Sequence, residues 1–547
     1  MLCQGSWVVS DAFELPGRDV KHQACGDHPE PDRLRGVELK LHNTLSGQKE
    51  AFVPMDSESG QVLFYSCGPT VYDFAHIGNF RSFLNADVLR RTLELIGHDV
   101  VQVMNITDVG HMTDDTVADG GGEDKMEVAS RRLAEAKKSG TLPPGVSIDA
   151  DDPRAIANFY ANAFLEDADR LGLKVARERD QHPERLPRPS ECVPQMIEMI
   201  EALIARGHAY VAEDGVVYFD VNSWEAYGEL SGNTVDRLRS GQGGRVDMET
   251  QAIKRSPADF MLWKPDPTHL MRWPSPWGEG YPGWHLECSV MARELLGDEI
   301  DLHSGGEDNI FPHHECEIAQ SRATTGKSSF ARYWFHTRHL MVNGAKMSKS
   351  AGTFFTIRDL IERGASPAAI RLELIRTHYR VNSNFTMQGL RDAQRQVDRW
   401  QRARAWLEEA GDTQRGDEIG PISGHLEAFK TALCDDLNIA GAIGVLNTAI
   451  AALPVDESPV SVPGACTWSA ELEALNQMNR VLGVFELEAQ AAQSGQEDEI
   501  EALIEERNQA RAARDWGRAD EIRDQLVEMG VVIKDSGDQT TWKRAVQ

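Results

Sequence analysis

The chain has 547 residues, of which 41% are hydrophobic and 26% charged, and its formal net charge is −29. This length suits about three or four domains, and no run approaches the roughly 20 apolar residues that a membrane-spanning helix needs. Eight irregularly spaced cysteines, without an N-terminal signal pattern, argue against a disulfide framework and for a reducing cytoplasm in which some thiols bind metal. The acidic balance predicts weak non-specific affinity for nucleic acid and leaves binding through local basic surfaces open.

The first elements in chain order predict an α/β sheet. Residues 1–37 are rich in polar residues, Pro and Gly and are expected to form an extension of little structure. The apolar run Val62–Tyr65 predicts a buried strand, and apolar residues from Phe80 to Ile96 recur at helical spacing. A second apolar run, Val100–Met104, predicts the next strand. Strand, loop, helix and strand in this order predict the start of a doubly wound sheet with parallel strands.

The loop between this first strand and the helix has features of a phosphate site. Ligands of such sheets bind at the carboxyl ends of strands, where the loop Cys67–Asn79 is expected. The loop ends in His76-Ile77-Gly78-Asn79 at a helix N-terminus, which attracts phosphate, and its glycine lets the backbone approach a ligand. This short motif alone is equally consistent with an ordinary loop.

The middle of the chain predicts an insertion and a connective region. The segment 113–153 is loop-rich with one expected helix, 126–138, and its role is open between a lid and a tolerated surface insertion. Residues 153–264 predict further helices and a β-hairpin that turns at Glu213-Asp214-Gly215. The parallel sheet is expected to resume near Trp284.

A second polar motif, Lys346-Met347-Ser348-Lys349-Ser350, follows the sheet and is flanked by glycines. Two lysines and two serines on such a loop suit a polyphosphate, although a basic pentapeptide alone is commonly a solvated turn. Helices are expected at 360–377 and 387–407, and the chain reads as helical to about residue 487. A polar linker, 490–497, then precedes a small module of one charged helix and a strand.

The two motifs, in this order and on this α/β pattern, resemble the paired signatures of class I aminoacyl-tRNA synthetases. The sequence from Cys67 to Asp73, Cys-Gly-Pro-Thr-Val-Tyr-Asp, narrows the resemblance to the cysteinyl-tRNA synthetases. The resemblance continues through Gly283–Cys288 and Phe311–Glu317 and covers nearly everything from Leu39 to the C-terminus. It implies a Rossmann-type catalytic domain with an inserted connective domain, then a helical bundle and a small mixed anticodon-binding module.

The resemblance also implies domain boundaries. They are 1–37 for the extension, 38–112 and 271–335 for the two halves of the catalytic domain, 113–270 for the insertion and connective region, 336–400 for the lysine loop and stem-contact region, 401–490 for the helical bundle and 498–547 for the anticodon-binding module.

Two thiols, an imidazole and a carboxylate form a candidate metal site. His313 and Glu317 are four residues apart and share one face of a predicted helix, while Cys67 and Cys288 are expected at two separate strand ends. Such a set suits tetrahedral zinc, although a buried cysteine is commonly an ordinary core residue.

Two neighbouring residues are alternative ligands. His314 and Cys316 adjoin this set but are expected to point to other faces of the helix. The family resemblance selects Cys67, Cys288, His313 and Glu317 as the ligands of one zinc ion per chain.

The resemblance implies a two-step reaction. L-cysteine and ATP, which arrives with Mg²⁺, would form cysteinyl-adenylate, and the cysteine would then be transferred to tRNA(Cys). His76 and Asn79 would donate to phosphate oxygens, and Lys349, secondarily Lys346, would neutralise the leaving pyrophosphate. The family motif commonly has His at the position of Asn79, and an amide can still donate a hydrogen bond.

Further residues follow from the resemblance. Gly78 would also contact ATP. The residues expected to line the cysteinyl-adenylate pocket are Thr70, Asn105, Thr107, Trp284 and Asp308. The residues expected to face the anticodon are Arg511, Trp516, Asp520 and Asp535, and Trp516 has the alternative role of a core anchor.

Two other functions stay open from the residues. One is a relative that activates cysteine but joins it to a small amine, such as the amino sugar of mycothiol synthesis, and that class lacks the anticodon module. The other is a non-catalytic RNA-binding relative, which would have lost the lysine motif or a zinc ligand. A monomer that acts in the cytoplasm is expected.

Overall fold

The structure is a computed structural model that describes residues 38–109, 112–114, 121–139, 148–149, 151–233, 253–348, 352–411, 418–459, 466–487, 494–528, 531–536 and 539–544. The expected N-terminal extension and Lys349 lie outside the described residues.

A parallel sheet of four strands carries the site. Its order is β12 (Ala331–Thr337), β11 (Ile300–Gly306), β3 (Gln61–Ser66) and β4 (Asp99–Met104). Most apolar side chains of these strands are buried, as expected for parallel strands covered on both faces. The chain runs outward from β3 to β4 on one side and from β11 to β12 on the other. The switch point of the sheet, where ligands bind, therefore lies between β3 and β11.

Helix α1 (Ile77–Leu95) connects β3 to β4, which confirms the predicted strand, helix and strand. His76 is its N-cap, and the side chains of His76 and Asn79 exchange capping hydrogen bonds with each other's backbone N–H groups. Gly97 follows the helix with φ +96°, a conformation that favours glycine. Helices α8 (Trp284–Leu296) and α9 (Glu315–Thr325) flank β11 in the chain. The sequence placed the resumption of the sheet near Trp284, but Trp284 begins α8, and β11 is the next parallel strand.

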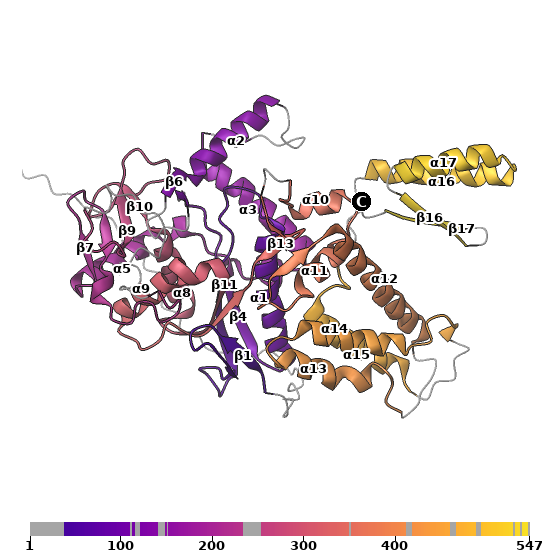
Figure 1. Cartoon of the computed structure of the whole chain (residues 1–547), viewed down its shortest axis with the longest axis horizontal. Helices are drawn as coiled ribbons and strands as arrows, with labels where there is room; N and C mark the ends of the chain where they lie inside the picture. Colours follow the sequence, from indigo (N-terminus) through magenta and orange to yellow (C-terminus); the bar gives the residue numbers. More distant parts are fainter. Residues whose placement is uncertain are drawn as a thin grey trace, which may run out of the picture.

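The connective region forms a second, antiparallel sheet beside the first (Figure 1). Its order is β10 (Gly280–Pro282), β9 (Phe260–Pro265), β8 (Val217–Phe219) and β7 (Ala209–Val211). The predicted hairpin is confirmed, since β7 pairs with β8 and Gly215 adopts φ +85° in the turn. The other elements of this half of the chain are β1 (Lys40–Asn43), β2 (Gln48–Ala51), β5 (Met112–Asp114), β6 (Gly121–Asp124), α2 (Lys125–Ser139), α3 (Pro153–Arg170), α4 (Lys174–Arg177), η1 (Pro183–Arg185), η2 (Pro189–Glu191), α5 (Val193–Ala205) and η3 (Val221–Ser223).

Helices dominate the C-terminal half. The helix expected at 360–377 is two helices, α10 (Ile357–Glu362) and α11 (Pro367–Ile375), because Gly364 adopts φ +88° and Ser366 caps the second helix. The remaining elements are η4 (Glu307–Asn309), η5 (Ile310–His314), β13 (Leu340–Val342), β14 (Ala345–Lys346), β15 (Ser383–Phe385), α12 (Met387–Ala410), η6 (Ser423–His425), α13 (Leu426–Cys434), α14 (Ile439–Ala451) and α15 (Trp468–Leu482).

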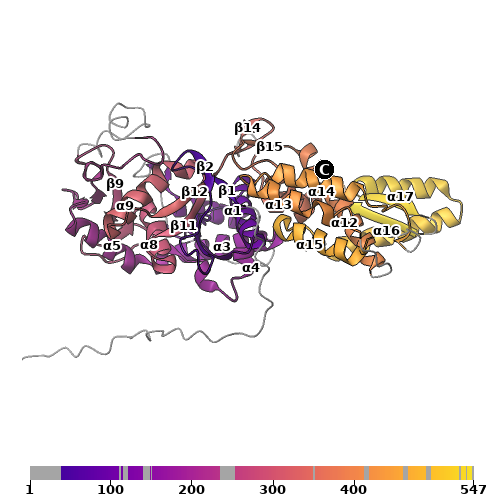
Figure 2. The same cartoon turned by 90° about the horizontal axis from the view of Figure 1, so that it is seen from below.

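A small module ends the chain and lies at the far end of the helical bundle (Figure 2). It consists of α16 (Ser494–Ala512), α17 (Trp516–Glu528) and a hairpin of β16 (Val531–Ser536) and β17 (Gln539–Arg544). The sequence predicted one helix here, but Arg514 adopts φ +60° and divides the helical segment in two. Helix α16 also starts inside the segment expected to be a linker. No helix in the described part of the chain has the length and apolarity to cross a membrane.

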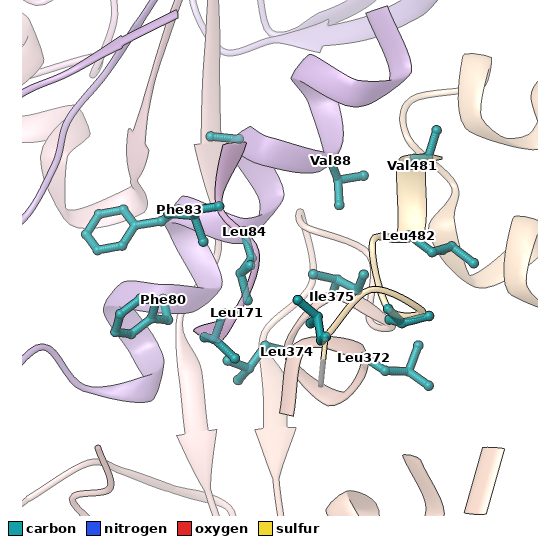
Figure 3. Close-up of a cluster of buried hydrophobic side chains, with 14 of the residues drawn as sticks. Phe80, Phe83, Leu84, Val88, Leu171, Leu372, Leu374, Ile375, Val481 and Leu482 are labelled. Atoms are coloured by element: carbon teal, nitrogen blue, oxygen red, sulfur yellow. The ribbon is translucent and has the colours of Figure 1, made fainter. Parts of the chain in front are cut away.

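The signature helix α1 and the helical bundle share one hydrophobic core. Figure 3 shows Leu84 and Val88 of α1 facing Leu372 and Ile375 of α11, with Leu482 from the end of α15 beside them. These side chains are buried or nearly so. Helices that lie almost 300 or more residues later in the chain therefore fix the orientation of α1.

Candidate active site and metal centre

The four predicted metal ligands meet at the switch point of the sheet. One ligand atom from each of Cys67, Cys288, His313 and Glu317 lies within 4.8 Å of all the others, and all four residues are buried. The Sγ atoms of Cys67 and Cys288 are 3.9 Å apart, and His313 Nε2 lies 3.0 Å from Glu317 Oε1. Cys67 follows β3 as expected, but Cys288 lies in the first turns of α8 and not at a strand end. The sequence does not distinguish the two positions, because a buried cysteine occurs both in amphipathic helices and at the ends of strands.

His314 also reaches this cluster, which corrects the expectation that it points elsewhere. Its Nε2 lies 3.2 Å from Cys67 Sγ. His314 and Glu317 are three residues apart, and residues at this spacing are neighbours on a helix, so His314 Nε2 also lies 3.9 Å from Glu317 Oε1. With His303 of β11, it completes a second candidate set: Cys67, His303, His314 and Glu317. Cys316, the other alternative, instead contacts the hydroxyl of Tyr227 at 3.5 Å.

The donor atoms fit a divalent cation with sulfur and nitrogen ligands. Glu317 Oε1 is buried and has no hydrogen-bond partner among the described residues, although His313 Nε2 is near. Burial opposes ionisation of Glu317, but His303 and His313 lower its pKa to about 2. A buried carboxylate beside two thiols and an imidazole is the ligand chemistry of zinc.

Without a cation the two thiols hold their protons. Burial raises the pKa of Cys67, and a hydrogen bond to Cys67 together with burial raises the pKa of Cys288 well above its usual value. A bound dication reverses this preference, because it favours the thiolate.

Further histidines hold the candidate ligands in place, and the sequence reasoning missed them. His285 Nδ1 lies 3.0 Å from His313 Nδ1, and His336 Nε2 lies 2.7 Å from His314 Nδ1. Such outer contacts orient metal-binding imidazoles. The indole of Trp284 stacks on His313, with ring centroids 4.4 Å apart.

The residues expected to line the substrate pocket join the ends of β3 and β4. Gly68 N–H donates to Asn105 Oδ1 (2.9 Å), and Asn105 Nδ2 donates to Thr107 Oγ1 (2.9 Å). Thr70 and Thr107 form an isolated parallel bridge. A Cβ on Gly68 would lie 1.8 Å from the carbonyl oxygen of Asn105, so this close approach requires glycine.

The other expected pocket residue, Asp308, lies in η4 directly after β11, and its charge contributes to the raised pKa of Cys67. Two residues that contact this expected set escaped the sequence reasoning. Glu287 is fully buried and accepts from Thr107 Oγ1 (3.3 Å), and the ammonium of Lys125 lies 5.3 Å from the centroids of the Tyr72 and Trp284 rings. No local pattern marks either one, because both contacts join segments distant in sequence.

The two signature motifs lie against each other. His76 Nδ1 accepts from the backbone N–H of Asn79 (3.1 Å), so the proton of the neutral ring is on Nε2, which can donate. The segment after the lysine motif crosses this helix start, where Ile77 N–H donates to Phe355 O (3.0 Å). Lys346 is exposed in β14.

The residues expected to face the anticodon lie in the terminal module. Arg511 is in the last turn of α16, and Asp535 is in β16. Trp516 begins α17 and is 58% exposed, which excludes the alternative of a core anchor. Asp520 is exposed one turn later and pairs with Arg523 at 3.0 Å.

Comparison with known proteins identifies both parts of the chain. Residues 53–395 match the class I (C) tRNA synthetase catalytic domain, and residues 494–542 match the cysteinyl-tRNA ligase anticodon binding domain. Cysteine–tRNA ligases of Salinibacter ruber and Symbiobacterium thermophilum are 43% and 41% identical to the chain. The alignments cover 93% of this chain in both cases, and 99% and 100% of the relatives.

Among solved structures, a leucyl-tRNA synthetase of Agrobacterium radiobacter K84 in a ternary complex matches with a TM-score of 0.51. It is 12% identical, and the match covers 79% of this chain and 85% of that one, which supports the fold alone. The fold class predicted from the sequence is thereby confirmed. On its sequence and on both of its matched domains, the chain belongs to the cysteine–tRNA ligase family of class I aminoacyl-tRNA synthetases.

Proposed function

We propose that the protein joins L-cysteine to tRNA(Cys) through cysteinyl-adenylate, at the expense of ATP with Mg²⁺, and that a zinc ion recognises the substrate thiol. The observation that carries this proposal is the meeting of four buried ligand atoms from three separate segments within 4.8 Å of one another. The cluster follows the same strand, β3, whose loop ends at the phosphate-binding motif of α1. The loop after β3 would therefore bind the side chain of the cysteine substrate at its start and the phosphates of ATP at its end.

Cysteine must be separated from serine, which has almost the same shape. A purely steric pocket rejects such an analogue only by roughly 10–200-fold. Zinc held by Cys67, Cys288, His313 and Glu317 would supply a soft Lewis acid that favours a thiolate over a hydroxyl. The four ligands would hold this ion in place. Trp284, which stacks on His313, would exclude water from the ion.

Activation needs no general base, because the carboxylate of cysteine is already a nucleophile. The residues of the chain would instead position the reactants and stabilise the charge at phosphorus. His76 Nε2 and the amide of Asn79 would donate to phosphate oxygens at the positive end of α1. Lys349, with Lys346, would neutralise the leaving pyrophosphate.

The terminal module supports tRNA as the acceptor. Residues 494–542 match an anticodon-binding domain, whereas a ligase for a small amine has no need of one. Exposed Trp516 is suited to stack on an unpaired base. We expect the protein to be a monomer and to act in the cytoplasm.

The test is ATP–pyrophosphate exchange by the purified protein with cysteine and with serine, followed by charging of tRNA(Cys). We expect ATP–pyrophosphate exchange with cysteine and not with serine, and we expect tRNA(Cys) to be charged with cysteine. Exchange without charging would favour the small-amine ligase, and equal exchange with serine would contradict a thiol-selective site.

A further inference from the structure

Helix α1 buries charged side chains that take no part in the site. Asp87 is 2% exposed and Arg371 of α11 is fully buried, and they form an ion pair at 2.6 Å. Buried charges are costly unless they are fully paired. Burial opposes ionisation of Asp87, but Arg91 and Arg371 hold its pKa well below the usual range. The carboxylate is therefore a fixed negative charge at the centre of an interface.

This carboxylate binds two arginines that hold the end of another helix. Arg371 Nε donates to Leu482 O (2.6 Å), and Arg91, which pairs with Asp87 at 2.7 Å, donates to Arg480 O (3.0 Å). Both carbonyls belong to the last turn of α15, whose carbonyl groups have no partner within the helix. Two cations at a helix C-terminus also complement its dipole.

Gly483, the residue after α15, has the conformation and the small size that this contact requires. Gly483 adopts φ +64°, and a Cβ there would lie 3.0 Å from Arg371 Cζ. Helix α15 is the last helix of the bundle, and α16 of the anticodon-binding domain begins at Ser494. Figure 3 shows Val481 and Leu482 at this junction beside Val88 of α1.

A second arginine fixes α1 to the same part of the chain near the site. Arg81 follows the signature motif by two residues and is fully buried. It donates to the carbonyls of Leu374, at the end of α11, and of Val381 beyond it (2.9 and 3.0 Å). Helix α1 is thus bonded to α11 near its first turn and near its middle, and to α15 near its end through Arg91.

We propose that Asp87, with Arg371 and Arg91, positions the helical bundle and the anticodon-binding domain relative to the signature helix, and that tRNA charging requires this position while cysteine activation does not. The inference rests on the proposed function. Asp87 is eleven residues from His76, or about 16 Å along a helix, so it does not touch the reactants. A tRNA held at the anticodon-binding domain must place its terminal ribose at the adenylate, and a small change in orientation there is costly.

The test compares Asp87→Asn with Glu178→Gln as a matched control. Glu178 is half-buried and pairs with Arg90 of α1 at 2.7 Å, so the control breaks an ion pair on the same helix without touching α11 or α15. Initial rates of ATP–pyrophosphate exchange and of tRNA(Cys) charging are measured, with thermal denaturation of each variant. We expect Asp87→Asn to lower kcat/KM for charging about tenfold or more, within the usual range of coupling between sites, and to change exchange little.

Glu178→Gln is expected to change both activities by the same factor. If Asp87→Asn also changes them equally, the residue has a structural role only and the inference is wrong. Should Asp87→Asn fail to fold, Arg91→Gln tests the same junction, because its side chain lies at the edge with 12% exposure. A wild-type protein that does not charge tRNA would overturn the proposed function as well, whereas equal losses overturn this inference alone.

Discussion

Met347 of the lysine motif packs against Gly78 of the first signature motif, so closely that a Cβ on Gly78 would lie 2.5 Å from Met347 Cε. The two motifs are separated by more than 260 residues, and this contact brings them to one point at the start of α1. The same Cβ would lie 2.9 Å from His76 Cε1. A side chain at residue 78 would therefore displace the flexible end of Met347 and crowd the ring of His76.

We expect Gly78→Ala to slow cysteine-dependent ATP–pyrophosphate exchange by about 10–100-fold, because a displacement of about 1 Å at a reacting group can cost that much. Thermal stability should change little. Gly444→Ala is the control, since no atom lies within 4 Å of a Cβ there and alanine suits the exposed face of α14. Unchanged exchange by Gly78→Ala would show that the ring of His76 moves freely.

Cys288→Ser should lose bound zinc and cysteine activation together, with exchange reduced by at least about 100-fold, since even outer contacts of a metal are worth 10–100-fold in affinity. Metal content and exchange are measured on the same preparation. Cys316→Ser is the matched control, because it is equally buried on α9 but contacts Tyr227. A metal-free protein that still selects cysteine over serine would refute the role of zinc.

Lys349→Ala should slow adenylate formation in a single turnover and leave cysteine binding nearly unchanged, because the lysine acts on charge that develops at the leaving pyrophosphate. A loss of about 100-fold or more is expected, as for removal of one such donor. Lys327→Ala, an exposed lysine after α9, controls for the loss of one surface charge. A normal single-turnover rate would count against the assigned role.

Trp516→Ala should raise the KM for tRNA(Cys) and leave exchange and thermal stability unchanged, because the indole is 58% exposed and buries little in the free protein. Stacking on one base is worth about 1–3 kcal/mol, so the KM should rise about 5–150-fold. Val211→Ala removes an exposed apolar side chain from the connective region and is the control. An unchanged KM would place the anticodon elsewhere.

Glu373 of α11 predicts a pH-dependent stability. Its side chain is 4% exposed, and burial raises its pKa from 4.5 to about 7, against the opposing charge of Arg376. Between these values the folded state keeps a proton that the unfolded chain releases, so stability falls as the pH rises from about 4.5 to 7. The loss amounts to about 3–4 kcal/mol, since one pKa unit corresponds to roughly 1.4 kcal/mol.

Glu373→Gln should remove this loss and be more stable than the parent at pH 8, as measured by urea denaturation at pH 5 and pH 8. Glu362→Gln, on the exposed side of α10, is the control. Its free energy of unfolding should differ between pH 5 and pH 8 by the same amount as that of the parent. A variant less stable than the parent at pH 8 would mean that the ion pair with Arg376 outweighs the burial of Glu373.

The sequence by itself determined the first elements of the parallel sheet and the family. Apolar runs predicted β3 and β4, helical spacing predicted α1, and the motifs at His76 and Lys346 led to the family that the comparisons confirm. These signals are local: each depends on the backbone geometry of a few consecutive residues, which a periodic pattern records. The candidate ligands Cys67, Cys288, His313 and Glu317 came from the family motif and not from periodicity.

Only the tertiary structure decided which side chains meet. It placed Cys288 on a helix, brought His314 and His303 to the cluster, and joined Asp87 to Arg371 in the core. These contacts join segments far apart in the chain, and each depends on how whole helices and strands pack. No local pattern encodes such packing, because the same helix face can bury a ligand, an ion pair or an ordinary apolar side chain, and its neighbours in space decide which.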